Sequence, residues 1–356
     1  FIPLLNFTYW YVKIFDYIRI QLLVIQILFF LGMVLCYDFS NLLEICTFVA
    51  LLSAIFYQIK IIYPYINFSY FKSPKTQDLD SCISIISVNV LQYNNSYNKL
   101  IDLVEAYRPN ILVTFETDEK WGKALSKIEK HYPNNINIPQ DNTYGIHFYT
   151  NLRVIKFVKH HLISSEVPSI EAHLIDNENR AFIFWGIHPP PPSPTEKATS
   201  KQKDAELMLV AKLVRAAKLP CIVTGDFNNV SWSRSSQLFA KVARLKDARL
   251  KKGLYGTFPA SFPMLRFPLD LLFHSKDFVV NQIQTLRNID SDHLPLYAVL
   301  SLVAENNVVS KPLPTELEEK TDRETQIGPT TTARRAAAGQ HATKQTTATA
   351  TGPGCI

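Results

Sequence analysis

Two long apolar segments near the N-terminus constrain the fold of this chain more than any other feature. The first runs from Ile20 to Tyr37 and the second from Leu42 to Ile66, with a short polar break between them. Each has about the length of a helix that crosses the hydrocarbon core of a bilayer, and neither has a polar face. Aromatic residues flank both segments, as at membrane–water interfaces. We therefore expect a membrane-anchoring region over residues 1–66, with about two transmembrane helices.

Two other interpretations of these segments are open. Buried core helices of a soluble protein would also be apolar, and a cleaved signal peptide would need a small-residue cleavage site, which does not follow the first segment. The basic residues Lys13, Arg19 and Lys60 border the segments, so a simple hairpin would place both of its ends in the cytoplasm. Because the chain begins with Phe1 rather than Met, we expect residues upstream, and one further helix there would reverse that side.

Charge and cysteine content exclude little. A net charge of +6 fits a phosphate-bearing substrate or an anionic membrane surface and establishes neither. The five cysteines contain no C-x-x-C pair, so the sequence indicates neither a zinc site nor a disulfide framework. The basic stretch from Arg244 to Lys252 is typical of a solvated loop.

Apolar runs alternate with amphipathic stretches from Ser81 to about Leu302. Helices are predicted over 98–107, 196–218 and 235–245. Strands are predicted over 82–91, 109–117, 144–150, 153–162, 169–176, 180–188, 220–228, 268–275 and 297–303. We expect 144–150 to pair with 153–162, and 169–176 with 180–188. Because strands outnumber helices and many fit antiparallel pairing, the fold class is α/β, with two sheets packed as a sandwich and helices outside.

The segments on either side of this region differ from it in composition. Residues 67–80 are largely polar and are expected to form a linker. Residues 303–356 are rich in small and polar residues, and we expect a disordered low-complexity tail. The domain between them covers residues 81–302.

Acids, amides and histidines recur near the ends of the predicted strands. Because strand ends can bring distant residues to one edge of a sandwich, we expect these side chains to share one cleft. "GDFNN", which contains Asp226, would by itself indicate an Asx-rich turn. The residues of this kind are Asn89, Glu116, His188, Asp226, Asn228, Asp292 and His293.

These motifs resemble the endonuclease/exonuclease/phosphatase superfamily, which includes deoxyribonuclease-like nucleases, inositol-polyphosphate phosphatases and neutral sphingomyelinases. The matching stretches are "SVNVL", "TFETD", "WGIHPPPP", "GDFNN", "FPLDLLFHS" and "SDHLP", in this order. The resemblance implies a deoxyribonuclease-I-like sandwich, here preceded by N-terminal transmembrane helices. "FETDEKW" and "HPPPP" also resemble a bacterial subgroup whose members commonly carry one more upstream helix. That subgroup implies the bacterial inner membrane, with the catalytic domain on the extracytoplasmic side.

The resemblance also implies a divalent metal site. Asn89 and Glu116 offer hard oxygen ligands suited to Mg²⁺ or Mn²⁺, and Asp292 is expected to reach the metal side. Two further residues are expected to bind substrate. Tyr144 is similar to a site-lining family position, although packing in the core or a turn fits as well. Arg266 would face the phosphate, with a surface arginine as the alternative.

Catalytic roles follow from the same resemblance. Asp226 is expected to activate or orient the attacking water, and Asn228 to hold a phosphate oxygen if the segment between them stays extended. His293 would donate to the scissile phosphate as charge builds, with Asp270 orienting its ring. His188 would bind phosphate or assist the leaving group.

The function expected from the sequence is a membrane-anchored, divalent-metal-dependent phosphoesterase. It would hydrolyse a phosphodiester, in nucleic acid or a lipid head group, by in-line attack of water. The alternatives are a phosphomonoesterase of the same fold and a non-catalytic membrane protein that binds phosphate. The expected partners are the phosphoester substrate, nucleic acid or phospholipid, and the lipid bilayer. The sequence indicates no protein partner, and it shows no clear basic stripe of the kind that holds a nucleic-acid backbone.

Overall fold

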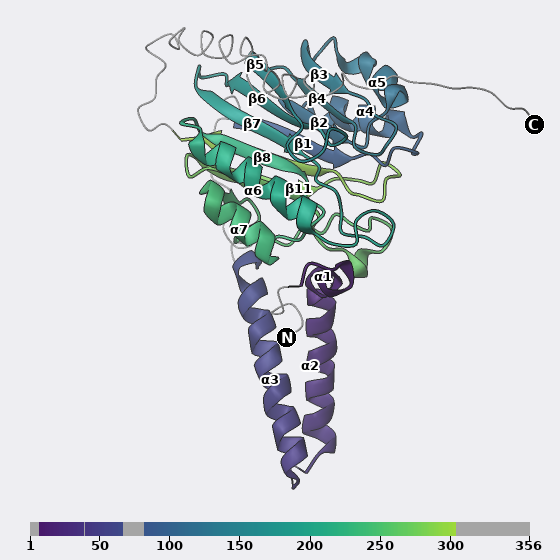
Figure 1. The fold of residues 1–356 in the computed structure, drawn as a ribbon, viewed down its shortest axis with the longest axis vertical. Coiled ribbons are helices and arrows are strands. Elements are labelled where there is room, and N and C mark those ends of the chain that lie inside the picture. The colour runs from purple at the N-terminus through teal and green to yellow at the C-terminus, as the bar shows by residue number, and fades with distance from the viewer. Residues whose placement is uncertain (1–6, 39, 67–81, 304–356) are drawn as a thin grey trace, which may run out of the picture. The chain divides into compact units, whose positions relative to one another are not determined.

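The computed structural model describes residues 7–38, 40–66 and 82–303 (Figure 1). The linker predicted over 67–80 lies outside these ranges, as does the tail predicted over 303–356 apart from its first residue.

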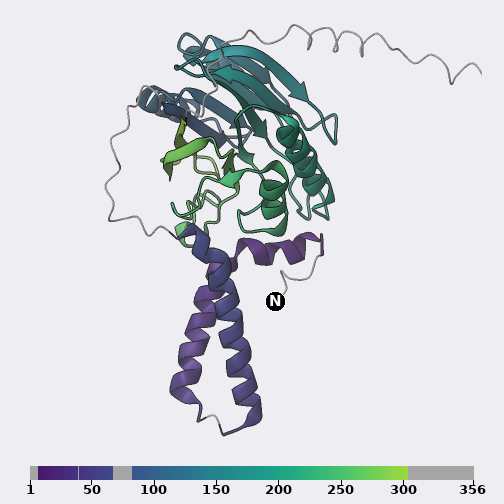
Figure 2. The same cartoon turned by 90° about the vertical axis from the view of Figure 1, so that its left-hand side faces the viewer.

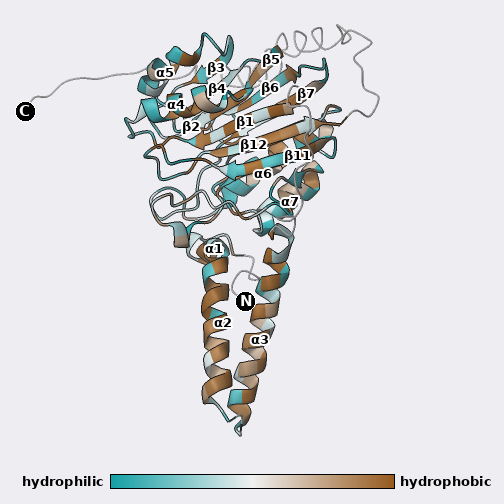
Figure 3. Ribbon diagram, turned by 180° about the vertical axis from the view of Figure 1, so that it is seen from behind, coloured by the Kyte–Doolittle hydropathy of each residue, from teal (hydrophilic) through white to brown (hydrophobic). Residues whose placement is uncertain are grey.

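Two apolar helices follow a short first helix, α1 (Trp10–Tyr17). They are α2 (Arg19–Cys36) and α3 (Leu42–Ile62), and the 3₁₀ turn η2 (Tyr63–Tyr65) extends α3. Both are long and apolar enough to cross a membrane, and only 11% of each apolar window is buried inside the protein. Figure 3 shows that most residues along both helices are hydrophobic. Core helices of a soluble protein would be mostly covered, so this exposure argues against that interpretation.

The remaining chain forms two six-stranded mixed sheets, and the predicted α/β sandwich is confirmed. The first sheet has the order β11-β12-β1-β2-β4-β3 and the second β5-β6-β7-β8-β10-β9. The strands of the first are β1 (Cys82–Asn89), β2 (Ile111–Phe115), β3 (Asn134–Ile138), β4 (Ile146–Thr150), β11 (Phe278–Thr285) and β12 (Leu296–Leu302). Those of the second are β5 (Arg153–His160), β6 (Ser169–Ile175), β7 (Ala181–Ile187), β8 (Cys221–Asp226), β9 (Lys246–Asp247) and β10 (Asp270–His274).

Helices cover the outer face of each sheet (Figure 2). Apolar side chains of α4 (Tyr97–Tyr107), α5 (Glu119–Leu125) and the turn η4 (Ser126–Ile128) pack on the first sheet. Those of α6 (Lys201–Ala216) and α7 (Arg234–Ala243) pack on the second. A third cluster fills the space between the sheets. Central strands such as β2, β7 and β8 are therefore buried on both faces, which explains their continuous apolar sequence.

The predicted pairing of 144–150 with 153–162 is wrong. β4 pairs with β2 and β3, whereas β5 pairs with β6 in the other sheet. The chain changes sheets between Thr150 and Arg153, where Leu152 is buried in the core between the sheets. An apolar residue in this short connection therefore joins the two layers instead of closing a hairpin. The predicted pairing of 169–176 with 180–188 is confirmed by β6 and β7.

Several elements of the structure were not predicted or begin at a different residue. β3, β9, β11 and α5 were not predicted from the sequence. The helix predicted over 196–218 begins only at Lys201, and the backbone N–H of Ser200 binds the carbonyl of Thr8 instead.

Gly225 of β8 is in register with Ile187 of the parallel strand β7. Its φ is +154°, and a Cβ added there would lie 1.9 Å from the carbonyl oxygen of Ile187. We expect Gly225→Ala to lower the free energy of unfolding by at least ~3 kcal/mol, because backbone must move. Gly32→Ala is the matched control, since a Cβ there meets nothing within 4 Å. Chemical denaturation in detergent measures both. Equal stability of the two variants would contradict the close approach.

Candidate active site

Two parallel strands of the first sheet end beside each other with polar residues. Asn89 closes β1, and Glu116 directly follows β2, whose Phe115 is in register with Asn89. Glu116 has a φ of 60°, so the chain turns sharply there. The Asn89 amide nitrogen donates to Glu116 Oε1 at 2.7 Å. The sheet thus places an amide and a half-buried carboxylate in direct contact at one edge.

The second sheet contributes acids at the same edge. Asp226 closes β8, and its antiparallel partner in register is Asp270, the first residue of β10. His188 follows β7, which runs parallel to β8. All three side chains are buried. Buried ionisable groups require polar partners. Asn89 donates to Asp226 Oδ2, and Asp270 Oδ2 pairs with His293, whereas Asp270 Oδ1 and His188 Nδ1 have no hydrogen-bond partner among the described residues.

One side chain links the two sheets directly. The Asn89 amide nitrogen also lies 3.1 Å from Asp226 Oδ2. A side-chain amide carries two N–H donors, so Asn89 donates to Glu116 of its own sheet and to Asp226 of the other. Residues far apart in the sequence therefore form one cluster, as expected.

Histidines lie on both sides of Asp226. His293 Nδ1 is 2.8 Å from Asp270 Oδ2, and its Nε2 is 3.6 Å from Asp226 Oδ2. His188 Nε2 is 3.7 Å from the same Asp226 oxygen. Burial favours a neutral ring, but Asp270 and Asp226 outweigh it and raise the pKa of His293 to about 10. Both ring nitrogens of His293 are then proton donors at neutral pH.

The two carboxylates bonded to Asn89 differ in their electrostatics. Burial opposes the charge of Asp226, yet His293, His188 and hydrogen bonds from Asn228 and Asn89 hold its pKa below the ordinary value. Burial raises the pKa of Glu116, and His188 and Asn89 only partly offset it. Asp226 is thus a stable carboxylate, whereas Glu116 lacks sufficient positive charge around it.

The surroundings of Glu116 fit a hard divalent cation. Its partners among the described residues are amides, namely Asn89 and the backbone N–H of Gln92 at 3.4 Å from Oε2. No described lysine or arginine forms an ion pair with Glu116. The negative charge of its carboxylate is therefore only partly balanced, and Oε2 has a lone pair free to bind a cation. Asp226, Asp270 and His293 also place candidate ligand atoms within 4.8 Å of one another. The proton on His293 Nδ1 is shared with Asp270 Oδ2 in a hydrogen bond, however, so Nδ1 is not free to bind a metal ion.

Asn228 differs from the expectation of an extended segment. Its φ is 48°, so the chain turns immediately after β8. Its backbone N–H donates to Asp226 Oδ1 at 2.9 Å, and its side-chain amide donates to the carbonyl of Pro189 at 3.1 Å. Asn228 therefore fixes the Asp226 carboxylate and the loop that follows His188.

The two predicted substrate-binding residues have different surroundings. Tyr144 lies with its ring centroid 5.3 Å from that of His188, and its hydroxyl donates to Glu196, so it borders the cluster. The Arg266 guanidinium donates to carbonyls of its own loop, at Ala260 and Pro259.

Asp292, the third predicted metal ligand, has an exposed side chain whose Oδ1 lies 3.4 Å from Ser291 Oγ. Within the described residues, neither Arg266 nor Asp292 forms a hydrogen bond or an ion pair with Glu116 or Asp226.

Three further residues support the cluster and were missed in the sequence. Ser291 Oγ donates to the carbonyl of Asn89 at 2.8 Å and accepts from the His293 backbone N–H at 3.0 Å. The Phe258 ring lies 4.9 Å from that of His293. The fully buried Arg249 donates to the carbonyl of Asp270. The sequence analysis placed Arg249 in a solvated basic loop. Of the three, only Ser291 could have been suspected from the sequence, because it directly precedes Asp292 and His293.

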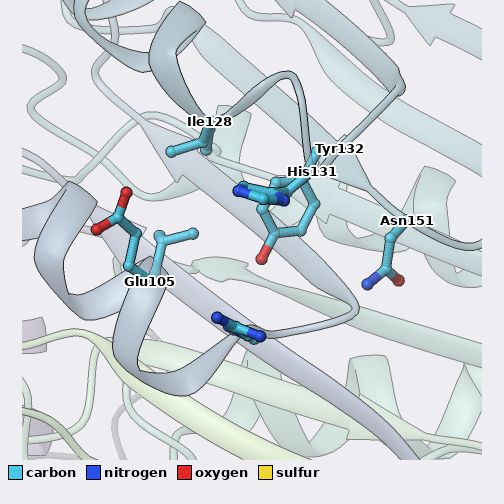
Figure 4. Close-up of a pocket in the computed structure, with 7 residues that line it drawn as sticks. Glu105, Ile128, His131, Tyr132 and Asn151 are labelled. Carbon is cyan, nitrogen blue, oxygen red and sulfur yellow. The ribbon is translucent and has the colours of Figure 1, made fainter.

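A pocket of about 390 Å³ lies apart from this cluster (Figure 4). Its lining comes from Val104, Glu105, Arg108, Ile128, His131, Tyr132 and Asn151. None of the strand-end residues lines it, so it is separate from the cluster.

Solved structures share this architecture. An endonuclease/exonuclease/phosphatase family protein from Bacteroides thetaiotaomicron is 21% identical, with a TM-score of 0.53 over 63% of this chain and 98% of that one. TDP2 of D. rerio, complexed with a single-strand DNA product, is 16% identical, with a TM-score of 0.53 over 62% and 100%. The human Nocturnin catalytic domain, with bound sulfate, is 21% identical, with a TM-score of 0.51 over 64% and 97%. These likenesses show the fold.

No match was found among curated protein sequences. The sequence model of the endonuclease/exonuclease/phosphatase family matches residues 86–293, which include every strand-end residue of the cluster. Because this match covers more than half of the 356 residues, the chain belongs to the endonuclease/exonuclease/phosphatase family.

Proposed function

We propose that the protein is a membrane-anchored, divalent-metal-dependent phosphodiesterase whose active site is the strand-end cluster. The observation that carries the proposal is the set of contacts joining Glu116, Asn89, Asp226, His293 and Asp270. Members of the family hydrolyse phosphoester bonds, which supports this reaction class. The cluster combines the carboxylate, amide and imidazole groups that such hydrolysis requires.

Glu116 would hold Mg²⁺ or Mn²⁺ through its carboxylate. Asn89 would contribute its side-chain oxygen, which also accepts from the backbone N–H of Leu91, because its amide nitrogen donates to the two carboxylates. A bound ion supplies Lewis-acid polarisation of a phosphoryl oxygen and neutralises the charge that develops during displacement. Asp292 is exposed and Arg266 is bonded to its own loop, so we assign neither a step.

Side chains of the protein then accept and donate the protons of the reaction. Asp226, ionised at neutral pH, accepts a hydrogen bond from the attacking water and takes its proton. His293, charged and fixed by Asp270, donates from Nε2 to a phosphate oxygen. The water oxygen bonds to phosphorus, the ester P–O bond breaks, and the leaving oxygen takes a proton from His188 or solvent. Tyr144, beside His188, would line the substrate position.

The proposed domain organisation assigns residues 1–66 to the anchor, 67–80 to a linker, 81–302 to catalysis and 303–356 to a tail. Support for the anchor comes from the exposed apolar surfaces of α2 and α3. The proposed location is the bacterial inner membrane, with catalysis on the extracytoplasmic side.

Asp226→Asn and Glu116→Gln should each lower the rate of bis-p-nitrophenyl phosphate hydrolysis by about 10²-fold or more, since each removes a charge at the reacting centre. EDTA should abolish wild-type activity, and Mg²⁺ or Mn²⁺ should restore it. Asp102→Asn, at an exposed acid on α4, is the matched control and should retain the rate. Equal rates in all variants, or activity unaffected by EDTA, would rule out this chemistry.

Asp270→Asn should shift the alkaline limit of activity to lower pH. Asp270 is the main partner that raises the pKa of His293 from 6.5 to about 10. At a pH below this pKa the His293 ring is charged and both nitrogens donate. The Nε2 proton is lost as the pH rises through the folded-state pKa. Wild-type activity should therefore persist between pH 7 and 9, whereas the variant should lose activity across that range. If the pH–rate profiles of the wild type and Asp270→Asn had the same alkaline limit, Asp270 would not be acting on the pKa of His293.

Carbonate extraction tests the anchor. The full-length protein should remain in the membrane fraction at high pH and be released only by detergent, because two exposed apolar helices gain more from the bilayer than from water. Release by carbonate alone would contradict membrane spanning.

A further inference from the structure

A turn beside the active site exposes several large apolar side chains. The turn surrounds η5 (Pro263–Leu265). Phe262, Met264 and Leu265 are 61%, 91% and 52% exposed. Clustered apolar side chains at a surface mark an interaction site rather than ordinary surface composition.

This turn contacts the beginning of the first apolar helix. The side-chain amide of Gln21, in the first turn of α2, donates to the carbonyl of Met264 at 3.1 Å. Farther along the helix, Val24 and Leu28 are 52% and 64% exposed. The η5 turn thus lies at the level where the proposed transmembrane helix begins, and Figure 1 shows it in green beside α1.

The preceding helix has the composition of an interfacial segment. Around α1, Tyr9, Tyr11 and Ile14 are 47%, 52% and 41% exposed. Tyrosine and tryptophan favour the membrane–water boundary, where the ring is apolar and the polar atom hydrated. α1 and the η5 turn therefore fit one boundary layer.

The same elements contact the catalytic cluster. The backbone N–H of Ala260 donates to the carbonyl of Asp292 at 2.7 Å, and Phe258 packs on His293. On the other side, Tyr17 of α1 donates to the carbonyl of Asn228 at 3.0 Å. Its ring also stacks on Phe267, with centroids 5.3 Å apart. The proposed membrane-side elements are therefore direct neighbours of His293 and Asn228.

We infer that the η5 turn inserts its apolar side chains into the bilayer surface, and that the active site takes a phosphoester carried by a membrane lipid. This inference rests on the proposed function. A phosphate at head-group depth would reach His293 without its lipid leaving the bilayer.

The charge of the turn favours lipid over nucleic acid. The stretch from Ala260 to Leu265, "ASFPML", contains no charged residue, and the Arg266 guanidinium is bonded to carbonyls. A nucleic-acid backbone gains affinity from basic side chains, whereas insertion into a bilayer surface gains from buried apolar area.

Fluorescence quenching tests the position of the turn independently of activity. The full-length protein, with Cys36, Cys46 and Cys355 changed to serine, would carry one labelled cysteine from Met264→Cys, Leu28→Cys or Val279→Cys. Leu28 lies in α2, and Val279, on β11, is a 45% exposed control away from the turn. Each protein would be reconstituted in vesicles of phosphatidylcholine and phosphatidylglycerol containing doxyl-labelled lipid.

We expect the lipid to quench labels at positions 264 and 28 but not at 279. Quenching at 28 without quenching at 264 would overturn the inference and leave the anchor intact. Absence of quenching at both positions would contradict the anchor of the proposed function as well.

Activity tests the substrate class. Met264→Glu should lower hydrolysis of vesicle phospholipid by about tenfold or more, because a charge opposes insertion. The same variant should keep its rate on soluble bis-p-nitrophenyl phosphate, and Val279→Glu should keep both rates. Unchanged lipid hydrolysis in Met264→Glu, or wild-type preference for single-stranded DNA or RNA, would overturn the lipid assignment. Failure of the wild type on every phosphodiester would instead contradict the proposed chemistry.

Discussion

The pair of hydrogen bonds donated by the Asn89 amide is the interaction on which the site depends. One goes to Glu116 of the same sheet and the other to Asp226 of the facing sheet. Two carboxylates brought this close in a partly buried place would repel each other. A neutral amide with two donors satisfies both without adding charge, and it fixes the two sheet edges to each other. In this arrangement the histidines beside Asp226 stabilise its negative charge, whereas the negative charge of Glu116 is only partly balanced.

This distribution of charge explains how similar side chains can take different roles. Asp226 lies between His188 and His293 and stays ionised, whereas the hydrogen-bond partners of Glu116 in the described part of the chain are amides, an environment that favours a cation. Asp270 bonds to His293 and makes its imidazolium stable. The proposed proton transfer and metal binding thus lie on opposite sides of one amide. The neighbouring contacts of Tyr17 and Phe258 place the proposed membrane boundary beside the same cluster.

The sequence predicted those parts of the molecule that local patterns encode. Buried strands were recognisable as apolar runs, and the polar residues at their ends, such as Asn89 and Asp226, identified one edge of the sandwich. The partner of β4 was not predictable, because Leu152 shows its inter-sheet position only in the folded core. Arg249 resembled a surface residue, since only tertiary packing buries it against Asp270. The turn at Asn228 and the contact of Tyr17 with its carbonyl likewise depend on long-range structure.

The central claim is that Asn89 holds Glu116 ready for a divalent cation while Asp226 and His293 remain available for proton transfer. Anomalous diffraction from crystals of the full-length protein grown with Mn²⁺ tests it most directly. The account predicts a manganese peak at direct coordination distance from the Glu116 carboxylate, with the Asp270–His293 hydrogen bond preserved. A peak bound instead by Asp226, Asp270 and His293, or none beside Glu116, would contradict it.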